Sequence, residues 1–508
     1  MNALDRLISV FSPQAGLRRA SARAMLDRLD RDYAAGKSGR RNRGWSGRGT
    51  SANVEIGPAM STLRNRAREF VRDSWAGQRI LDVLVSHVIG TGITVVANTG
   101  SDRADNQFRL AYEEWHDQAD VEGVLDFSAM QGLTLRSMIE GGDSVIRFID
   151  LTSQEADGSV PFRLQGMEGD QIDTSRDYGI AGSNTRLGVE LGDNGRRKGL
   201  WLWKNHPGDM SVSSLVGGST MVEWANLCHL YRPLRWGQVR GITWFAPILL
   251  NGREMQDLTD AAIMQARTQA CFAGFRKSQP GDPNPFATKD ATDGAGDSQK
   301  VTRIEPGMIV DIGNSDMVFA QPSSQSQFGT VYVAGMQAMA AGAGITYDQL
   351  TGDLRQANYS SLRAGKIDFR RLVEQIQWQM AAPRLVLPTT RRFTERAILA
   401  GKLRPRSDGY PVDLIMPANE PIDPKKDLEA DIASVRAGRQ SPQEFISAWG
   451  RDWKKVVADT RTFFDVVDKA KLALDIDGRR PLNGGSPPAP AAQNGDGAPQ
   501  NPQDGNND

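Results

Sequence analysis

The sequence predicts an α+β protein that is mainly α-helical. Several long stretches repeat apolar residues at helical spacing, and short strand-like runs between Gly, Asn and Asp turns fill residues 158–235. The clearest helical face has two adjacent rows, Ile80, Leu84, Val88 and Leu81, Val85, Ile89. With 508 residues the chain exceeds the length at which one hydrophobic core stops growing, so two or more substructures are expected.

The N-terminal half is expected to alternate helices with strands. A capped helix is predicted to start at Ser61, and Gly90 and Gly92 end the helical pattern that follows it. The later elements are a strand over 93–97, a helical stripe with Phe108, Tyr112 and Trp115, a helix before Gly141, a strand over 143–149, and strand-like runs at 187–191, 200–204 and 227–232. This half therefore contributes most of the predicted sheet.

A long helix is predicted after Pro247, over about residues 248–276. It carries five alanines that give it a slim surface for another backbone to approach: Ala261, Ala262, Ala266, Ala270 and Ala273. Residues 278–298 hold six Pro and Gly in 21 positions, which predicts a loop. Strand-like runs at 309–312 and 317–320 and a second small-residue helix at 331–344 follow.

The stretch TYDQLTGDLRQANYSSLRAGK (346–366) reads as a polar loop that leads into a helix over about 361–380. Asn358, Ser360 and Ser361 are candidate caps for that helix. One helix face is apolar, with Leu362, Phe369, Val373, Ile376 and Met380, and Pro383 and Pro388 should bend or end the helix. The other side carries Arg363, Lys366 and Arg370 on one stripe, which is either a simple solvated face or a surface that contacts a partner.

The two ends of the chain have biased compositions. Residues 1–50 contain eleven Lys and Arg against four Asp and Glu, which favours a flexible basic arm that either contacts nucleic acid or an acidic partner, or is simply solvated. A helical module is expected over about 424–477, with a capping box at Ser441 and Glu444. Residues 481–508 have no Lys, Arg or aromatic residue and 11 Pro and Gly, which predicts a disordered tail.

The overall composition predicts a cytosolic, soluble protein. Lys plus Arg and Asp plus Glu are both 61, so the net charge is zero and a surface that is basic throughout is excluded. The sequence contains no run of 18 apolar residues, so no membrane span is predicted. Cys228 and Cys271 lie far apart without a CxxC pattern, which indicates two small buried residues in a reducing compartment.

No motif in the sequence predicts an enzyme, a cofactor or a metal. Gly36-Lys37-Ser38 has Arg31 where a phosphate loop needs its first Gly, and Gly365-Lys366 lies inside a predicted helix. The chain has no G-x-S-x-G elbow, and its four histidines lack paired-ligand spacing, so that His87 is expected to be structural. The carboxylates Glu420, Asp423 and Asp427 could suggest a metal nuclease, but Asp423 fits a helix cap better.

Four segments of the sequence resemble the lambda-type portal proteins of tailed bacteriophages. The most specific is the string LTGD…NYSSLRAG within 347–365, and the others are 63–93, 240–275 and 422–445, in the same order along the chain. The resemblance implies the phage portal fold of wing, stem, clip and crown in a protomer that forms a dodecameric ring at one capsid vertex. It also implies that DNA passes along the ring's axis.

The resemblance divides the chain into nine regions. They are a flexible basic arm (1–50), an α+β wing (51–247), a first stem helix (248–277), a clip (278–322), a second stem helix (323–345), a tunnel loop (346–360), a long bent helix with a return to the wing (361–423), a helical crown (424–480) and a disordered tail (481–508). Zero net charge suits such a conduit, because a strongly basic lining would hold DNA too tightly for it to slide.

The resemblance also names candidate contact residues and partners. The candidates for the DNA channel are Asp353, Arg355, Gln356, Asn358, Arg363, Lys366 and Arg370, and those for motor docking in the clip are Asp282, Asn284, Phe286 and Lys289. The expected partners are other copies of the chain, double-stranded DNA bound without sequence readout, the terminase large subunit, major capsid and scaffold proteins, and head–tail connector proteins. Two alternatives remain: a metal-dependent nuclease of DNA processing and a different virion adaptor protein.

Overall fold

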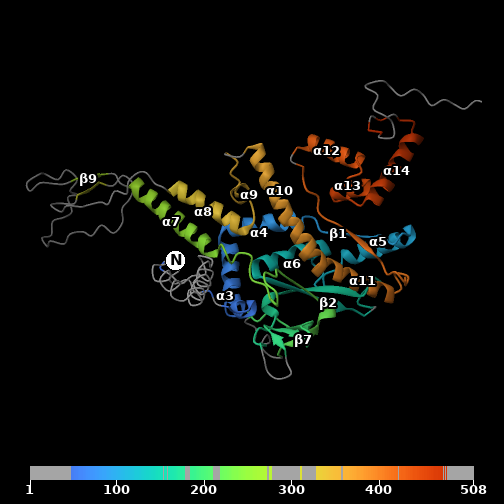
Figure 1. Cartoon of the computed structure of the whole chain (residues 1–508), viewed down its shortest axis with the longest axis horizontal. Coiled ribbons are helices and arrows are strands. Elements are labelled where there is room, and N and C mark those ends of the chain that lie inside the picture. The colour runs from blue at the N-terminus through green and yellow to red at the C-terminus, as the bar shows by residue number, and fades with distance from the viewer. Residues whose placement is uncertain are drawn as a thin grey trace, which may run out of the picture. The chain divides into compact units, whose positions relative to one another are not determined.

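A computed structural model describes most of the chain between residues 49 and 477 (Figure 1). The described ranges are 49–152, 154–156, 158–177, 184–209, 218–271, 274–276, 309–311, 328–355, 358–421 and 423–472, with the single residues Arg40, Gly47, Leu474, Ile476 and Asp477. The chain forms two compact units, Met1–Thr91 with Leu110–Arg404, and Gly92–Arg109 with Pro405–Asp508. The predicted α+β class with mainly helical content is confirmed. The predictions for the basic arm and the tail fall almost wholly outside the described residues.

The first two helices of the first unit within the described ranges are α3 (Ala52–Asp73) and α4 (Trp75–Val88). The prediction that a helix starts at Ser61 is wrong, because α3 begins at Ala52 and passes through Pro58. As the seventh residue of α3, Pro58 removes one backbone hydrogen bond of the helix without ending it. The predicted apolar rows of α4 are mostly confirmed, since Ile80, Leu81 and Leu84 are fully buried.

A three-stranded antiparallel sheet has β2 (Asp143–Asp150) at its centre, between β3 (Phe162–Glu168) and β8 (Leu227–Tyr231). Helix α6 (Phe127–Gly141) leads directly into β2. Below this sheet Trp115 is fully buried, stacks on Phe162 at 5.6 Å and donates a hydrogen bond from its indole nitrogen to the Phe162 carbonyl at 2.8 Å. A large aromatic side chain with a satisfied polar atom is a strong core anchor.

A second sheet has the order β4 (Thr185–Arg186), β5 (Val189–Leu191), β6 (Arg197–Leu202) and β7 (Thr220–Glu223), all antiparallel. The strands alternate, so that their buried residues share one apolar cluster with the first sheet. The buried members of this cluster are Val145, Met167, Ile172, Leu187, Val189, Leu200, Leu202, Val222, Leu227 and Val239. Both sheets thus lie within one continuous core.

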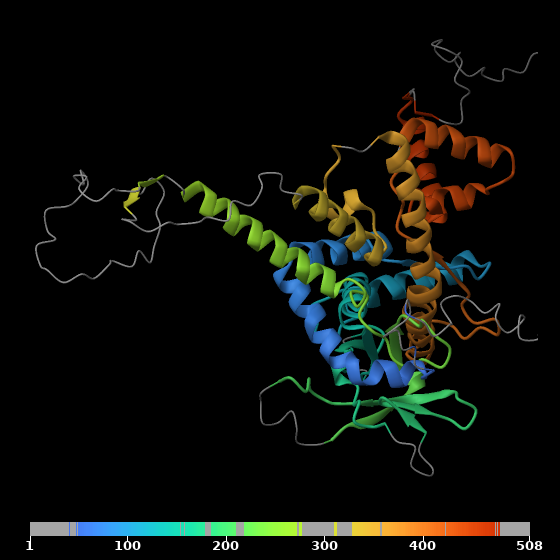
Figure 2. The same ribbon diagram turned by 60° about the vertical axis from the view of Figure 1, so that its left-hand side comes forward.

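Helices α7 (Leu249–Cys271) and α8 (Phe328–Ala343) lie side by side (Figures 1 and 2). Small residues permit this packing, because a Cβ at Gly335 would clash with the Met255 side chain and one at Gly342 with Ile248. The prediction that the first of these helices continues to residue 276 is wrong. The chain changes to a short strand, β9 (Gly274–Arg276), which pairs in parallel with β10 (Ile309–Asp311).

One uninterrupted helical path runs from α10 (Tyr359–Ile376) through η6 (Gln377–Val386) to α11 (Leu387–Leu399), as Figure 2 shows. The expectation that Pro383 and Pro388 bend or end the helix is wrong as regards an end, because the helical path continues through both prolines to Leu399. The ten residues of η6 form a π-helix, and Pro383 lies inside it. The wider π turns remove the clash that a proline ring makes with the carbonyl one α-turn earlier.

In its described residues, the second unit contains an antiparallel pair, β1 (Thr94–Ala97) and β11 (Val412–Ile415), followed by a group of helices after β11. These are α12 (Pro424–Arg436), α13 (Pro442–Ala448) and α14 (Trp453–Lys469). The predicted caps are confirmed, since the Asp423 side chain accepts from the Lys426 amide and Ser441 with Glu444 closes a capping box. Helix α5 (Asp102–His116) contains the boundary between the two units.

Within the described ranges, no helix is long and apolar enough to cross a membrane.

Candidate nucleic-acid interface

The predicted polar loop at 346–360 contains a short helix, α9 (Tyr347–Thr351), which the sequence did not indicate. Thr346 caps it and shares a capping box with Gln349. Gly352 ends it with φ +70°, a left-handed conformation that favours glycine. The loop is therefore built of ordered turns, with Gly352 as the point where the helix stops.

Asp353 and Arg355 form a closed pair directly after Gly352. The Arg355 Nε and Nη2 atoms donate to the two Asp353 carboxylate oxygens, each at 2.9 Å, and the Arg355 amide donates to the same carboxylate at 3.1 Å. These bonds lower the pKa of Asp353 to about 2. Although the Arg355 side chain is 88 % exposed, its charge is already compensated, so a DNA phosphate would have to compete with Asp353 for it.

Asn358 is the N-cap of α10. Its side-chain oxygen accepts from the Ser361 amide at 2.8 Å, and the Ser361 hydroxyl accepts from the Asn358 amide at 3.1 Å. Of the three candidate caps, Asn358 is thus the cap and Ser361 its reciprocal partner. This role satisfies backbone groups at the helix start, which explains Asn358 without any contact to nucleic acid.

The predicted basic stripe lies along one side of α10, next to the apolar face rather than opposite it. Arg363 and Lys366 are exposed and Arg370 is half-buried. The positions i, i+3 and i+7 place these three side chains along one side of the helix. On the apolar face Phe369, Val373, Ile376 and Met380 are buried, whereas Leu362 is only half-buried. The helix therefore offers a short basic edge next to its N-terminus.

Helix α4 holds both α9 and the middle of the long helix. The Arg79 Nε atom donates to the Gln349 carbonyl at 2.8 Å, and the Gln377 side-chain amide donates to the Val88 carbonyl at 2.9 Å. The ring of His87 contacts Phe369 edge-to-face at 4.9 Å while its Nδ1 lies 2.8 Å from the Val83 carbonyl. The prediction that His87 is structural is confirmed. The stripe is thus fixed to the fold by helix-to-helix contacts.

Several candidates cannot be placed. Gln356 and the four clip candidates, Asp282, Asn284, Phe286 and Lys289, lie outside the described residues. The structure therefore brings Asp353, Arg355 and Asn358 together at the start of α10, and it places Arg363, Lys366 and Arg370 along the helix.

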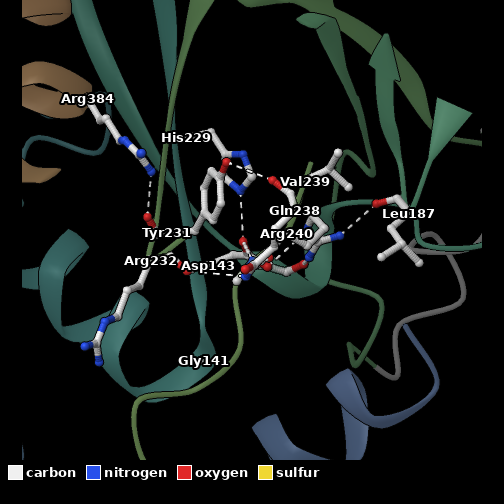
Figure 3. Close-up of polar contacts among 12 residues, drawn as sticks. Gly141, Asp143, Leu187, His229, Tyr231, Arg232, Gln238, Val239, Arg240 and Arg384 are labelled. Carbon is white, nitrogen blue, oxygen red and sulfur yellow. Dashed lines mark hydrogen bonds and ion pairs between the residues drawn. The ribbon is translucent and has the colours of Figure 1, made fainter. Parts of the chain in front are cut away.

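Sequence patterns did not reveal a buried charge network around Asp143, the first residue of β2 (Figure 3). The Asp143 carboxylate accepts from Arg240 Nε at 2.8 Å, from the Gly241 amide at 2.8 Å and from His229 Nε2 at 2.9 Å. Arg240 also donates to the Leu187 and Gly169 carbonyls at 3.0 Å and 2.9 Å. Side chains of Asp143, Arg240 and His229 are fully buried, so this network joins both sheets to the chain segment after β8.

The network fixes the protonation states of its members. Burial alone would raise the pKa of Asp143, but Arg240, His229 and Arg64 outweigh it and hold that pKa well below its usual range. Burial lowers the pKa of His229 more than Asp143 raises it. The Nδ1 atom of His229 faces Arg197 Nη1 at 3.4 Å and must accept, so His229 is neutral and carries its proton on Nε2.

Glu168, Asp170 and His206 lie near this network, and their side chains are close enough together to be considered as metal ligands. An arginine already takes the cation's place, because the Arg68 guanidinium donates to both carboxylates and Arg64 pairs with Asp170 at 3.0 Å. Two guanidinium groups beside the carboxylates oppose the entry of a divalent cation. This group is therefore an ion-pair network.

Comparisons with known proteins agree on one family. A family model described as phage portal protein, lambda family, matches residues 38–377. The chain is 25% identical over 457 residues to a probable portal protein of Halomonas phage phiHAP-1, covering 86% of this chain and 87% of that protein. It is 22% identical over 369 residues to portal protein B of Escherichia phage lambda, covering 63% and 66%.

Among solved structures, the chain is similar to one from the neck of a native gene transfer agent particle. The identity is 14%, the TM-score is 0.38, and the match covers 79% of this chain and 94% of that one.

Proposed function

Because the chain belongs to the lambda family of phage portal proteins, which are structural proteins of the virion and not enzymes, we propose that it forms a dodecameric ring at one capsid vertex. The ring would be the channel through which DNA is packaged and later ejected. The observation that carries this proposal is the family match over residues 38–377, which includes α7, α8, α9 and α10.

Exposed surface on α7 supports the ring. Ala261 and Ala266 are exposed within the described chain, and the nearby Ile263 is 44% exposed. Leu250, at the start of the same helix, is 74% exposed. A closed ring needs two different complementary surfaces on each protomer, and a slim helix face with apolar side chains suits one of them. Leu250 and Ala261 lie on one side of the helix and Ile263 and Ala266 on the other, and we assign this exposed surface to the contacts between neighbouring protomers.

The proposed regions follow the elements of the structure. The wing comprises 51–247, α7 and α8 form the stem, and 278–322 is the clip between them. The tunnel loop at 346–360 contains α9, the long helix is α10 with η6 and α11, and α12, α13 and α14 form the crown. We further propose that the clip docks the terminase large subunit and then head–tail connector proteins, and that the wing contacts capsid and scaffold proteins.

The exposed stripe of α10 is the proposed contact with DNA. Arg363 and Lys366 supply two cations per protomer, and the ring repeats them around its axis. Such contacts would reach the phosphate backbone without reading bases, as a channel for any sequence requires. Arg355 contributes less than its exposure suggests, because Asp353 neutralises it. Repetition of a weak contact would guide DNA without holding it.

Ring assembly is tested by native mass spectrometry or electron microscopy of the purified chain. The expected particle has close to twelve times the protomer mass of 55.6 kDa, with a central channel. Monomers or dimers alone under assembly conditions, or particles without a channel, would overturn the proposal.

DNA handling is tested with substitutions that spare the ring. Gly352→Val strains the left-handed turn, and Asn358→Ala removes the cap of α10, so both should lower the yield of packaged DNA while rings still form. Arg363→Gln with Lys366→Gln should also lower DNA retention, because it removes the exposed cations. Normal packaged-DNA yields from all three variants would refute the assignment of this loop and stripe.

A further inference from the structure

A cavity of about 480 Å³ lies between residues of both sheets on one side and residues of η6 and α11 on the other. The side of the sheets contributes Arg197 from β6, Trp224 from the 3₁₀ turn η5 (Trp224–Asn226) and Tyr231 from β8. The helical side contributes Arg384, Arg391 and Arg392. All these residues belong to the first compact unit. The cavity is therefore walled on both sides by guanidinium groups.

Two of the four guanidinium groups contact neutral partners, and a third makes no ion pair in the described chain. Arg384 donates to the Tyr231 carbonyl at 2.7 Å, as Figure 3 shows, and lies 4.9 Å from the centre of the Tyr231 ring. Arg197 donates to the Tyr231 hydroxyl and to the Val239 carbonyl at 3.2 Å, and lies 5.2 Å from the Trp224 ring centre. Arg391 is exposed and makes no ion pair in the described part of the chain.

The carboxylates near the cavity do not balance this charge. Arg392 takes both of them, with Asp150 at 2.9 Å and Glu395 at 3.6 Å. The Asp150 carboxylate is also bonded by Arg396. Of the residues that line the cavity, four are arginines and one, Glu395, is acidic, which leaves an excess of three positive charges.

An excess of like charge in a partly enclosed space is unfavourable unless an anion enters. Burial lowers the pKa of Arg197, and the charge of Arg384 acts in the same direction. Guanidinium groups present their N–H donors as planar forks that match phosphate and carboxylate oxygens. The neutral partners of Arg197 and Arg384 hold the two forks in place without satisfying their charge.

We propose that this cavity binds a small phosphate-bearing anion, either free phosphate or the phosphate of a nucleotide. A phosphate group offers three or more acceptor oxygens and close to two negative charges at neutral pH, which suits the three cavity arginines that make no ion pair in the described chain better than a single carboxylate does. The volume admits a small molecule, and a DNA duplex is too wide to enter it. The site is separate from the exposed stripe of α10, and it does not require ring formation.

Calorimetric titration of the purified full-length chain tests the proposal. Inorganic phosphate, ADP and citrate are each titrated at constant ionic strength into the wild-type chain and into two variants. Arg391→Gln removes an exposed cavity arginine, and Arg66→Gln on α3 removes an exposed arginine elsewhere in the same unit. Circular dichroism confirms that both variants fold.

The expected result is phosphate or ADP binding that Arg391→Gln weakens about tenfold or more, as for loss of a charged hydrogen bond, and that Arg66→Gln leaves unchanged. Tighter binding of ADP than of phosphate would identify a nucleotide as the source, and equal binding would identify free phosphate. The proposal is overturned if neither anion binds, if citrate binds more tightly than both, or if the two variants bind as the wild-type chain does. Arg384→Gln repeats the test from the other end of the helical wall.

Discussion

Replacing Asp143 by Asn removes the centre of the buried charge network while keeping its shape. In the wild-type chain the carboxylate accepts from Arg240, His229 and the Gly241 amide, all within 2.9 Å, and Arg64 lies 3.7 Å away. The amide of Asn carries no charge, so Arg240 stays fully buried without a counter-ion. Breaking one side of a buried ion pair destabilises proteins by about 3–5 kcal/mol. We expect a loss of that size in the free energy of unfolding.

Urea unfolding followed by tryptophan fluorescence measures this loss. Nine of the eleven tryptophans belong to the first unit and two to the second, so the fluorescence mainly reports unfolding of the unit that contains Asp143. The control is Asp82→Asn, which breaks a half-exposed pair with Arg136 and should cost less than about 1 kcal/mol. Since the pKa of Asp143 is lower in the folded chain than in the unfolded one, its contribution is full above pH of about 4 and is lost as the pH falls further.

A loss below about 1 kcal/mol at pH 7.5, or a loss equal to that of the control, would refute the reasoning. It would mean that Arg240 is solvated or paired in another way after the substitution.

Three further predictions follow from buried groups. Burial lowers the pKa of His229, so below a pH of about 6.5 the unfolded chain binds a proton that the folded chain does not. The free energy of unfolding should therefore fall by up to about 1.4 kcal/mol for each pH unit below that value. His229→Asn should remove this slope, and an unchanged slope would contradict the assignment. Burial raises the pKa of Cys228 to about 12. In a Cys271→Ser chain the Cys228 thiol should therefore resist alkylation at pH 8 until urea unfolds the protein. Rapid alkylation of the folded chain would show that Cys228 is accessible to solvent. Gly335→Val should separate α7 from α8, because the new side chain would collide with Met255. Its melting temperature should be lower than that of the wild-type chain, whereas Gly329→Ala, which has open space around it, should change the melting temperature little. Equal melting temperatures for the two variants would disprove the close packing.

The features that the sequence predicted correctly depend on residues close together in the chain. Asn358, Asp423 and Ser441 cap helices through bonds to backbone groups three residues ahead, so a short motif suffices to find them. The apolar face of α10 follows from helical periodicity in the same way. The general fold class follows because such local signals extend over most of the chain.

The features that the sequence did not predict depend on distant partners or on competition between local rules. Asp143 and Arg240 are 97 positions apart, and nothing near either residue indicates the other. Asp353 and Arg355 are close in sequence, but the sequence alone does not tell whether their charges pair with each other or face a ligand. At Pro383 the rule that proline interrupts an α-helix held, yet packing of α10 against α4 and of η6 against β8 kept the path helical.

The π-helical segment η6 changes which side of the long helix faces inward along its length. In a regular α-helix each residue turns the chain by about 100°, so a basic edge that starts at Arg363 would keep a steady course. The wider turns of η6 shift that course before α11 begins, and Arg391 and Arg392 of α11 come to line the cavity beside Arg384 of η6. Deleting one residue between Gln377 and Val386 would therefore rotate the whole of α11 by about that angle and carry Arg391 and Arg392 away from the cavity. The number of residues in η6 therefore determines which side chains of α11 face the cavity.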